Sequence, residues 1–269
     1  MPRGGRASEA RGGSGRPETP GGPGAPETSW SRSGANRPRP PRAPRVRSEV
    51  KPQLPEERPR LERSAWNDLR SNVDPNRLDD VARAFGAAGD ALEDGDVERA
   101  LELLRWAKSA GGRSPAIREA LGIALYLQGS FAAAAAELQA YQRLSGRNDQ
   151  NHVLADCARA AGRSDKVQAY VAAMDPRDVG ASRWVEGLIV LAGDRADRGD
   201  LGAAMATLER ADLEPRCIQA WHPRVWYAAG DIAERSGDRR RARELFEAIV
   251  AVDPEFLDAE DRLAGLTAG

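Results

Sequence analysis

The chain has 269 residues and a formal net charge of −1, but this near-neutral total hides two oppositely charged parts. Residues 1–47 contain ten Arg and three Glu and so carry +7, which leaves −8 on the rest of the chain. No stretch approaches the about 18 uninterrupted apolar residues of a membrane span, and no apolar core of signal-peptide length follows the N-terminal Arg residues. We therefore expect no membrane association, no secretion and a cytoplasmic location.

Residues 1–60 are expected to form a disordered basic tail. Residues 1–47 hold nine of the 18 Pro and nine of the 27 Gly, and Trp30 and Val46 are almost their only large apolar residues. Such a segment buries too little apolar surface to offset the loss of chain entropy on folding. Unstructured Arg with Gly and Pro can bind RNA through phosphate contacts, which makes RNA a candidate partner of the tail. A solubilising leader or tether explains the same composition equally well.

A short helix is predicted next, within residues 61–75. Leu61, Trp66 and Leu69 fall on one side of this helix, and Pro75 closes it. We expect the helix to pack as an N-terminal cap on the domain that follows.

From residue 76 onward the pattern predicts helices only, because no alternating apolar run rich in β-branched residues lies between turn residues. Short breaks centred on a Gly recur at intervals of 34, 33, 37 and 38 residues. A repeat of this length is typical of helical hairpins that stack side by side, since one hairpin cannot bury its apolar face alone. Each Gly is expected to supply the positive φ that ends a first helix, and the Asp or Ser after it to cap a second helix. The five residues are Gly95, Gly129, Gly162, Gly199 and Gly237.

The residues after each break also repeat. Each second helix carries a small residue followed four positions later by a larger apolar one, and residues four apart share one face of a helix. The small residue allows close helix approach, and the larger one fills the adjoining space. The five pairs are Ala100 and Leu104, Ala134 and Leu138, Val167 and Val171, Ala204 and Leu208, and Ala242 and Phe246.

These features resemble the tetratricopeptide repeat, a pattern of about 34 residues with a Trp, a Leu-Gly pair, an aromatic residue and then Ala, Phe and Pro. The last unit matches it with Trp226, Gly230, Ala242, Phe246 and Pro254. The second unit matches it with Leu121, Gly122, Leu125, Gly129, Phe131, Ala134 and Leu138. The resemblance implies an all-α, right-handed α-solenoid of about five hairpins over residues 76–266, with a final capping helix in "EFLDAEDRLAGL". The two longer intervals predict longer turns around residues 174–180 and 213–223.

The whole layout is similar to actinobacterial tetratricopeptide proteins in which an Arg/Pro/Gly-rich tail precedes the repeats. The sequences "AIREALGIALY", "ELQAYQRLSGRND" and "LADCARAAGR" carry this resemblance. It implies an architecture and no particular biochemical activity.

The sequence contains few residues that could support an enzyme. His152 and Asp156 are four residues apart on one predicted helix, a spacing at which a carboxylate can orient an imidazole. No nucleophile with a supporting motif accompanies them, no cluster of metal ligands is evident, and no phosphate-binding loop follows a strand. We therefore expect a non-enzymatic chain without a cofactor, and an enzyme that uses His152 and Asp156 remains as a hypothesis.

Two further features have ordinary structural interpretations. Cys157 and Cys217 are expected to be small buried residues in a reducing compartment. The Arg-rich run "DRRRARE" at residues 238–244 is expected to form an outer helix face with Glu–Arg pairs and not a nucleic-acid patch.

A partner-binding groove is predicted on the first helices, which line the concave surface of a stack of hairpins. Its mixed apolar and acidic lining suits a protein or peptide with hydrophobic anchors and basic groups; a second copy of the chain or its own tail are alternative occupants. The carboxylate clamp that grips acidic chaperone tails is disfavoured, because the corresponding positions hold Phe85, Gly89 and Glu119. The predicted groove residues are Phe85, Glu119, Ile123, Tyr126, His152, Asp156, Arg159, Tyr227, Asp231 and Glu234.

The sequence thus predicts a non-enzymatic scaffold or adaptor that binds a protein partner on its concave surface. The alternative is an RNA- or ribosome-associated protein recruited through the basic tail.

Overall fold

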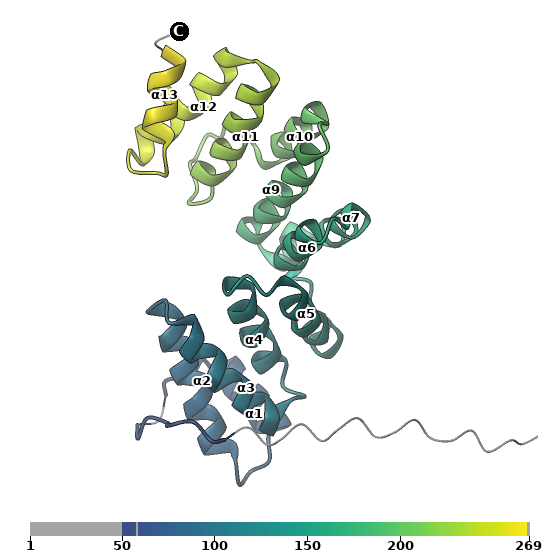
Figure 1. The fold of residues 1–269 in the computed structure, drawn as a ribbon, viewed down its shortest axis with the longest axis vertical. Coiled ribbons are helices and arrows are strands. Elements are labelled where there is room, and N and C mark those ends of the chain that lie inside the picture. The colour runs from purple at the N-terminus through teal and green to yellow at the C-terminus, as the bar shows by residue number, and fades with distance from the viewer. Residues whose placement is uncertain (1–49, 58, 268–269) are drawn as a thin grey trace, which may run out of the picture. The chain divides into compact units, whose positions relative to one another are not determined.

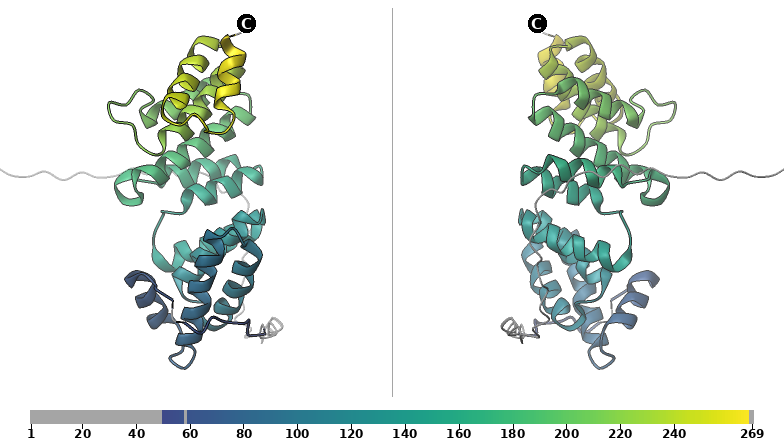
Figure 2. Two further views of the ribbon diagram at one scale, coloured as in Figure 1. Left: turned by 90° about the vertical axis from the view of Figure 1, so that its left-hand side faces the viewer. Right: turned by 90° about the vertical axis from the view of Figure 1, so that its right-hand side faces the viewer.

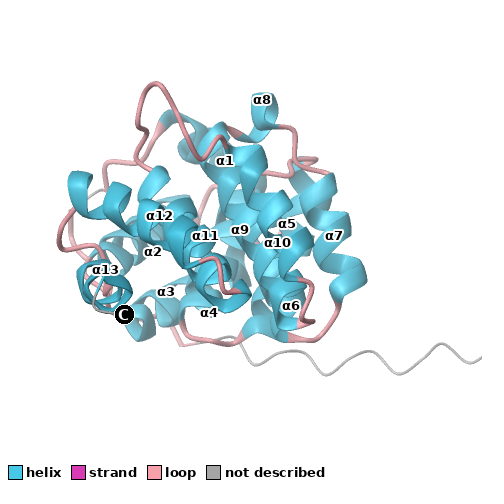
Figure 3. Cartoon of the chain, turned by 90° about the horizontal axis from the view of Figure 1, so that it is seen from above, coloured by secondary structure: helices cyan, strands magenta, loops and turns pink. Residues whose placement is uncertain are grey.

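A computed structural model describes residues 50–57 and 59–267. The described part consists of helices and loops without a strand (Figure 3). The chain divides into two units, residues 1–45 and 46–269, and every described helix belongs to the second unit. Residues 1–49 of the predicted tail lie outside the described residues. Within the described ranges, no helix has the length and apolar character needed to cross a bilayer.

Five helical hairpins follow one another in chain order in the described part, as predicted (Figures 1 and 2). In each hairpin we call the earlier helix the first helix and the later one the second helix. The hairpins are α2 (Leu78–Glu93) with α3 (Val97–Gly111), α4 (Pro115–Leu127) with α5 (Phe131–Ser145), α6 (Asn151–Ala160) with α7 (Ser164–Ala172), α9 (Ala181–Asp197) with α10 (Leu201–Leu208), and α11 (His222–Ser236) with α12 (Arg239–Val252).

The turn between the two helices of every hairpin has the predicted backbone. All five Gly of the repeat adopt positive φ, between 68° and 83°. The predicted capping by the following residue holds in three hairpins, where Asp96, Asp200 and Asp238 each accept a backbone N–H from three residues onward. It fails at Ser130, whose hydroxyl donates to the Gln128 side chain, and at Ser164, whose hydroxyl donates to Asp194 of the next hairpin.

The repeated pairs on the second helices form the interior of each hairpin. All ten residues are buried, and Val171 is the most accessible of them at 3%. A Cβ placed on Gly122 would lie 2.6 Å from the Leu138 side chain, and one on Gly230 would lie 2.8 Å from the Phe246 ring. The small residue of the first helix therefore permits the helices to approach, as the tetratricopeptide pattern implies.

The first hairpin is covered by the chain that precedes it. In α1 (Arg63–Asn72), Leu69 is fully buried, and Asp68 accepts the backbone N–H of Ala116 (3.1 Å) and the hydroxyl of Ser114 at the start of α4. Within residues 50–57, which the sequence assigns to the tail, Pro52 is buried, Leu54 packs against the N-terminal apolar cluster, and the Gln53 carbonyl accepts a hydrogen bond from Arg99 of α3. These contacts lie on the first hairpin, and the other residues of this segment are exposed.

The last hairpin is covered by α13 (Ala259–Thr267), the predicted capping helix, which packs against α12. The two long turns also lie where the sequence predicts them. The first contains the short helix α8 (Pro176–Val179), and the second begins with the 3₁₀ turn η1 (Glu209–Ala211). Two apolar clusters of buried residues meet at α6, and Tyr170 of α7 packs against both.

Candidate functional site

The ten predicted groove residues all lie on first helices, namely α2, α4, α6 and α11. Their side chains make different kinds of contact along the chain. The structure divides them into three groups, and in each group the side chains have different neighbours.

The N-terminal group borders an open pocket. Phe85 of α2 and Glu119 and Ile123 of α4 line a cavity of about 390 Å³, together with Ala65 of α1. Glu119 accepts a hydrogen bond from the Gln150 side chain (2.7 Å). Burial raises the pKa of the Glu119 carboxyl above its ordinary value, and the hydrogen bond from Gln150 opposes that shift.

The central group forms polar bridges between hairpins. The Tyr126 hydroxyl donates to Asp156 of α6 (2.6 Å), and burial together with this bond raises the pKa of Tyr126. The Arg159 guanidinium donates to Asp197 at the end of α9 (2.9 Å) and lies 3.5 Å from Asp156. The side chains of Tyr126, Asp156 and Arg159 therefore bind one another and the next hairpin.

His152 does not form the pair that an enzyme would need. Its Nδ1 atom is buried and has no hydrogen-bond partner among the described residues, whereas the Asp156 carboxylate is engaged by Tyr126 and Arg159. Burial lowers the pKa of His152. The predicted His152–Asp156 arrangement is thus not assembled in this structure.

The C-terminal group holds the capping helix. The Tyr227 hydroxyl donates to Asp258 (2.6 Å), while Arg262 of α13 donates to Asp231 (3.2 Å) and to Glu234 (2.9 Å). The same guanidinium lies over the Phe246 ring at 4.8 Å and over the Tyr227 ring at 5.5 Å. Burial would lower the pKa of Arg262, but the hydrogen bonds to Glu234 and Tyr227 outweigh it, and the net shift is upward.

A single rule describes these contacts: a polar side chain of one first helix binds a residue of the next first helix or of the cap. Between α9 and α11 the same link is made by Glu186 and Arg224 (2.6 Å) and by the Ala196 carbonyl and Arg235 (2.9 Å). Sequence reasoning missed the partner residues, although each lies 28 to 39 positions after its counterpart, which is about one repeat. The missed partners are Gln150, Asp197, Arg224, Arg235, Asp258 and Arg262.

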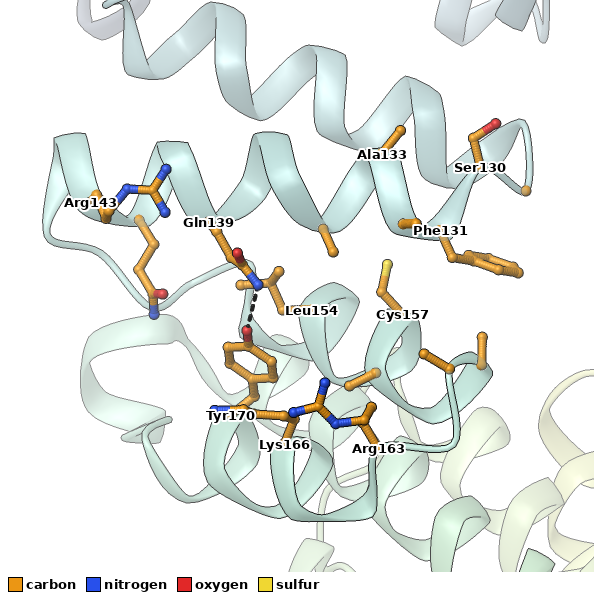
Figure 4. Close-up of a pocket in the computed structure, with 17 residues that line it drawn as sticks. Ser130, Phe131, Ala133, Gln139, Arg143, Leu154, Cys157, Arg163, Lys166 and Tyr170 are labelled. Carbon is orange, nitrogen blue, oxygen red and sulfur yellow. Dashed lines mark hydrogen bonds between the residues drawn. The ribbon is translucent and has the colours of Figure 1, made fainter. Parts of the chain in front are cut away.

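A second, larger cavity of about 970 Å³ lies between α5, α6 and α7, and sequence reasoning missed it as well (Figure 4). It is lined by second helices, by α6 and by turn residues, and none of the ten predicted groove residues lines it. The signal in the sequence was the run "FAAAAA" at residues 131–136, which places no charge on the first six residues of α5.

The described part is similar in structure to a thermophilic TPR protein of Thermus thermophilus, at a TM-score of 0.54 and 15% sequence identity. The match covers 70% of this chain and 100% of that chain. The chain has the tetratricopeptide-repeat fold.

A second similar structure is YrrB, a TPR protein whose structure is described as having an unusual peptide-binding site. It matches at a TM-score of 0.44 and 15% identity, over 67% of this chain and 90% of that chain. No protein-family model and no curated protein matches the sequence.

The two cysteines differ in burial. Cys157 is buried in α6, and burial raises the pKa of its thiol to about 11. Cys217 is exposed in the loop after η1, so the expectation of burial is wrong for this residue; the long turn there places it outside any hairpin interior. Among the described residues, no three His, Cys, Asp or Glu side chains converge as metal ligands would.

The Arg-rich start of α12 behaves as expected for an outer helix face of the repeat. Arg240 pairs with Glu244 (3.3 Å), and Arg243 pairs with Glu247 (3.5 Å). Arg241 pairs with both Glu244 and Glu214. Intrahelical neutralisation of this kind leaves no concentrated positive patch for a polyanion.

Proposed function

We propose that this chain is a non-enzymatic, cytoplasmic scaffold that binds a protein partner on the face formed by its first helices. The pocket between α1, α2 and α4 is the proposed point of attachment. The observation that supports this choice is that Phe85, Glu119 and Ile123 line an open cavity there, whereas the central and C-terminal groups are engaged in bonds between hairpins.

The lining of this pocket indicates the kind of partner. Phe85, Ile123 and three alanines supply apolar surface, and the acidic residues Glu62 and Glu119 stand at its edge with Asp68. Asp68 is already bonded to Ser114 and the backbone of α4. A partner that inserts one apolar side chain and places a Lys or Arg beside it would match both the shape and the charge of this pocket.

The fold supports a scaffold in a general way, because stacked hairpins expose long surfaces made of successive helices. The non-enzymatic part of the proposal follows from the sequence, and in the structure the Asp156 carboxylate accepts from Tyr126 and not from His152. The proposal of a cytoplasmic location is based on the composition of the sequence.

Site-specific crosslinking in the native cell tests the proposal. A photoreactive phenylalanine analogue at Ile123 should form an adduct with a protein, and the same group at Arg105, an exposed position of α3 without a bonding partner in the described structure, should not. The Ile123→Lys variant places a cation where the partner's own cation is expected. It should therefore bind the same partner more weakly than the unchanged chain does. Equal adducts at both positions, or none at residue 123, would contradict the proposal.

The same crosslinking variants distinguish the proposed scaffold from the alternative, in which the basic tail recruits RNA. If the tail recruits RNA, association should be nuclease-sensitive and should disappear in a chain that begins at residue 50. Deletion should stop before residue 50 because residues 50–57 pack on the first hairpin. A protein adduct at residue 123 that survives nuclease and tail removal favours the scaffold.

A further inference from the structure

The large cavity between α5, α6 and α7 is an open groove between two second helices (Figure 4). The two helices that flank it are joined by one hydrogen bond between their side chains, from Gln139 to the Tyr170 hydroxyl (3.0 Å). The groove runs along α5 from Phe131 to Arg143 and along α7 from its N-cap Arg163 to Tyr170.

The floor of this α5–α7 groove is apolar, with Leu154 (1% exposed) and Cys157 (4% exposed) buried at its base and exposed apolar residues at one end. Leu154 and Cys157 of α6 lie between the flanking helices, and Phe131 of α5 is 37% exposed at one end. Ala132 and Ala133 are exposed beside it. The outer face of α12 carries four Arg in its first five residues, so an uncharged outer surface is not a general property of second helices in this chain.

The rim of the groove is basic. Arg143 stands on the α5 side, and Arg163 and Lys166 stand on the α7 side, while no Asp or Glu is among the lining residues (Figure 4). Within the described residues, Arg143 and Lys166 form no ion pair, and Arg163 has only an exposed contact with Asp165 (3.4 Å). Most other cations that face a neighbouring hairpin are bound, for example Arg159 to Asp197 and Arg262 to Glu234. Among the described residues, Arg143 and Lys166 thus lack an acidic partner, and Arg163 has only the exposed contact with Asp165.

We propose that the α5–α7 groove binds an acidic segment of a partner protein, which inserts an aliphatic or aromatic side chain between Phe131, Leu154 and Cys157. The argument for this occupant is charge complementarity with the rim and apolar complementarity with the floor. The chain's own tail is excluded as the occupant, because its ten Arg and three Glu would bring like charge to a basic rim. A single-stranded nucleic acid is disfavoured, because it needs aromatic faces for successive bases and this floor is mostly alanine and leucine.

This binding site is separate from the proposed pocket at Phe85 and Ile123. Helix α5 contributes residues to both, but the two share no lining residue and have opposite charge. A chain with both sites would hold two partners of opposite character, one basic and one acidic. The experiments on the two sites are therefore independent.

A random 12-residue peptide library displayed on phage, selected against the full chain, tests the proposal. The selected peptides should be enriched in Asp and Glu around a Leu, Phe or Trp. A fluorescein-labelled copy of the best peptide should bind with an affinity that falls as salt is raised, since exposed charges on both sides are screened. The double variant Arg143→Glu/Lys166→Glu should weaken this binding at least tenfold.

A matched pair of substitutions on α5 locates the binding. Ala133 lines the groove, whereas Ala136, three residues later on the same helix, is exposed outside it. Ala133→Trp should fill the groove and abolish peptide binding, and Ala136→Trp should leave it unchanged; circular dichroism checks that both variants keep their helix content.

Several outcomes would overturn the proposal. They are a selection that yields no acidic peptides, peptides that bind the two Trp variants equally, preferential binding of a labelled single-stranded RNA in the groove, and a concentration-dependent self-association that Ala133→Trp abolishes. The last of these would assign the groove to a second copy of the chain.

Discussion

Where the two helices of a hairpin cross, the presence or absence of a Cβ atom on the first helix decides how large a side chain the second helix can place there. Gly122 and Gly230 leave room for Leu138 and Phe246, and a Cβ at either position would lie within 2.8 Å of those side chains. Other hairpins place Ala88, Ala155 or Ala192 seven residues before their turn Gly, where the second helix leaves space for a methyl group. The tolerated side chain at this position therefore differs between hairpins of one chain.

The Gly230→Ala variant should lower the free energy of unfolding by about 1–3 kcal/mol, because the added methyl overlaps a fully buried ring that has no space to move. Gly89→Ala is the matched control. Gly89 is exposed inside α2, and a methyl group added there would have no other atom within 4 Å, so this variant should gain about 0.5–1 kcal/mol of helix propensity. Urea unfolding of both variants measures the difference, and effects of the same sign would show that helix approach at Gly230 is not tight.

His152 makes stability depend on pH. Burial and Arg183 lower the pKa of the imidazole, while Glu186 and Asp149 oppose the shift. As the pH falls below about 6.5, the unfolded chain binds a proton that the folded chain resists, so the free energy of unfolding decreases on the acid side. His152→Gln should reduce the stability lost between pH 7.5 and pH 5.5, by at most about 1.4 kcal/mol per pH unit. Thermal unfolding at both pH values measures this difference, and an identical loss in the two proteins would contradict it.

At the scale of the helix, most of the sequence signals concern how elements begin and end. Asp238 accepts the N–H of Arg241, so Asp238→Ala should cost about 1 kcal/mol by leaving an N–H at the helix start unpaired. Ser130 occupies the equivalent position in α5, but its hydroxyl bonds Gln128, so Ser130→Ala should change stability by only a few tenths of a kcal/mol. Chemical denaturation of the two variants checks the contrast, which disappears if the caps contribute nothing.

The hairpins could be predicted from sequence because their requirements are local. Each turn needs a residue that tolerates positive φ, such as Gly237, and each crossing needs a small residue opposite a large one, such as Gly230 opposite Phe246. The packing of residues 50–57 could not be predicted in this way, because their composition resembles that of the tail. Only the exposed face of the first hairpin gives Pro52 and Leu54 a surface to cover.

The candidate sites were predictable to a smaller extent. The repeat register places the ten groove residues on first helices, but the register does not identify the residues of other helices that bind them. Asp197 reaches Arg159 across an interval lengthened by α8, and Arg262 reaches α11 from the capping helix. The α5–α7 groove is formed by residues of three helices, and no spacing of Gly residues indicates how far apart α5 and α7 lie.

At the scale of the whole described unit, stability should be divided along the chain. Helix contacts join each hairpin to the next, and the two apolar clusters, one N-terminal and one C-terminal, meet at α6. In a stack of this kind, stability is approximately a sum of hairpin terms and nearest-neighbour terms, so damage at one end need not spread to the other.

Hydrogen exchange can test this division with two matched core substitutions. Ile249 of α12 and Leu103 of α3 are both fully buried, one in each cluster, and truncation of either to Ala should remove about 2–5 kcal/mol of local stability. Ile249→Ala should speed amide exchange in α11 to α13 and leave α2 and α3 protected, whereas Leu103→Ala should do the reverse. If either variant instead speeds exchange equally in both end hairpins, the chain unfolds as a single cooperative unit, and the contacts across α6 are as strong as those within each cluster.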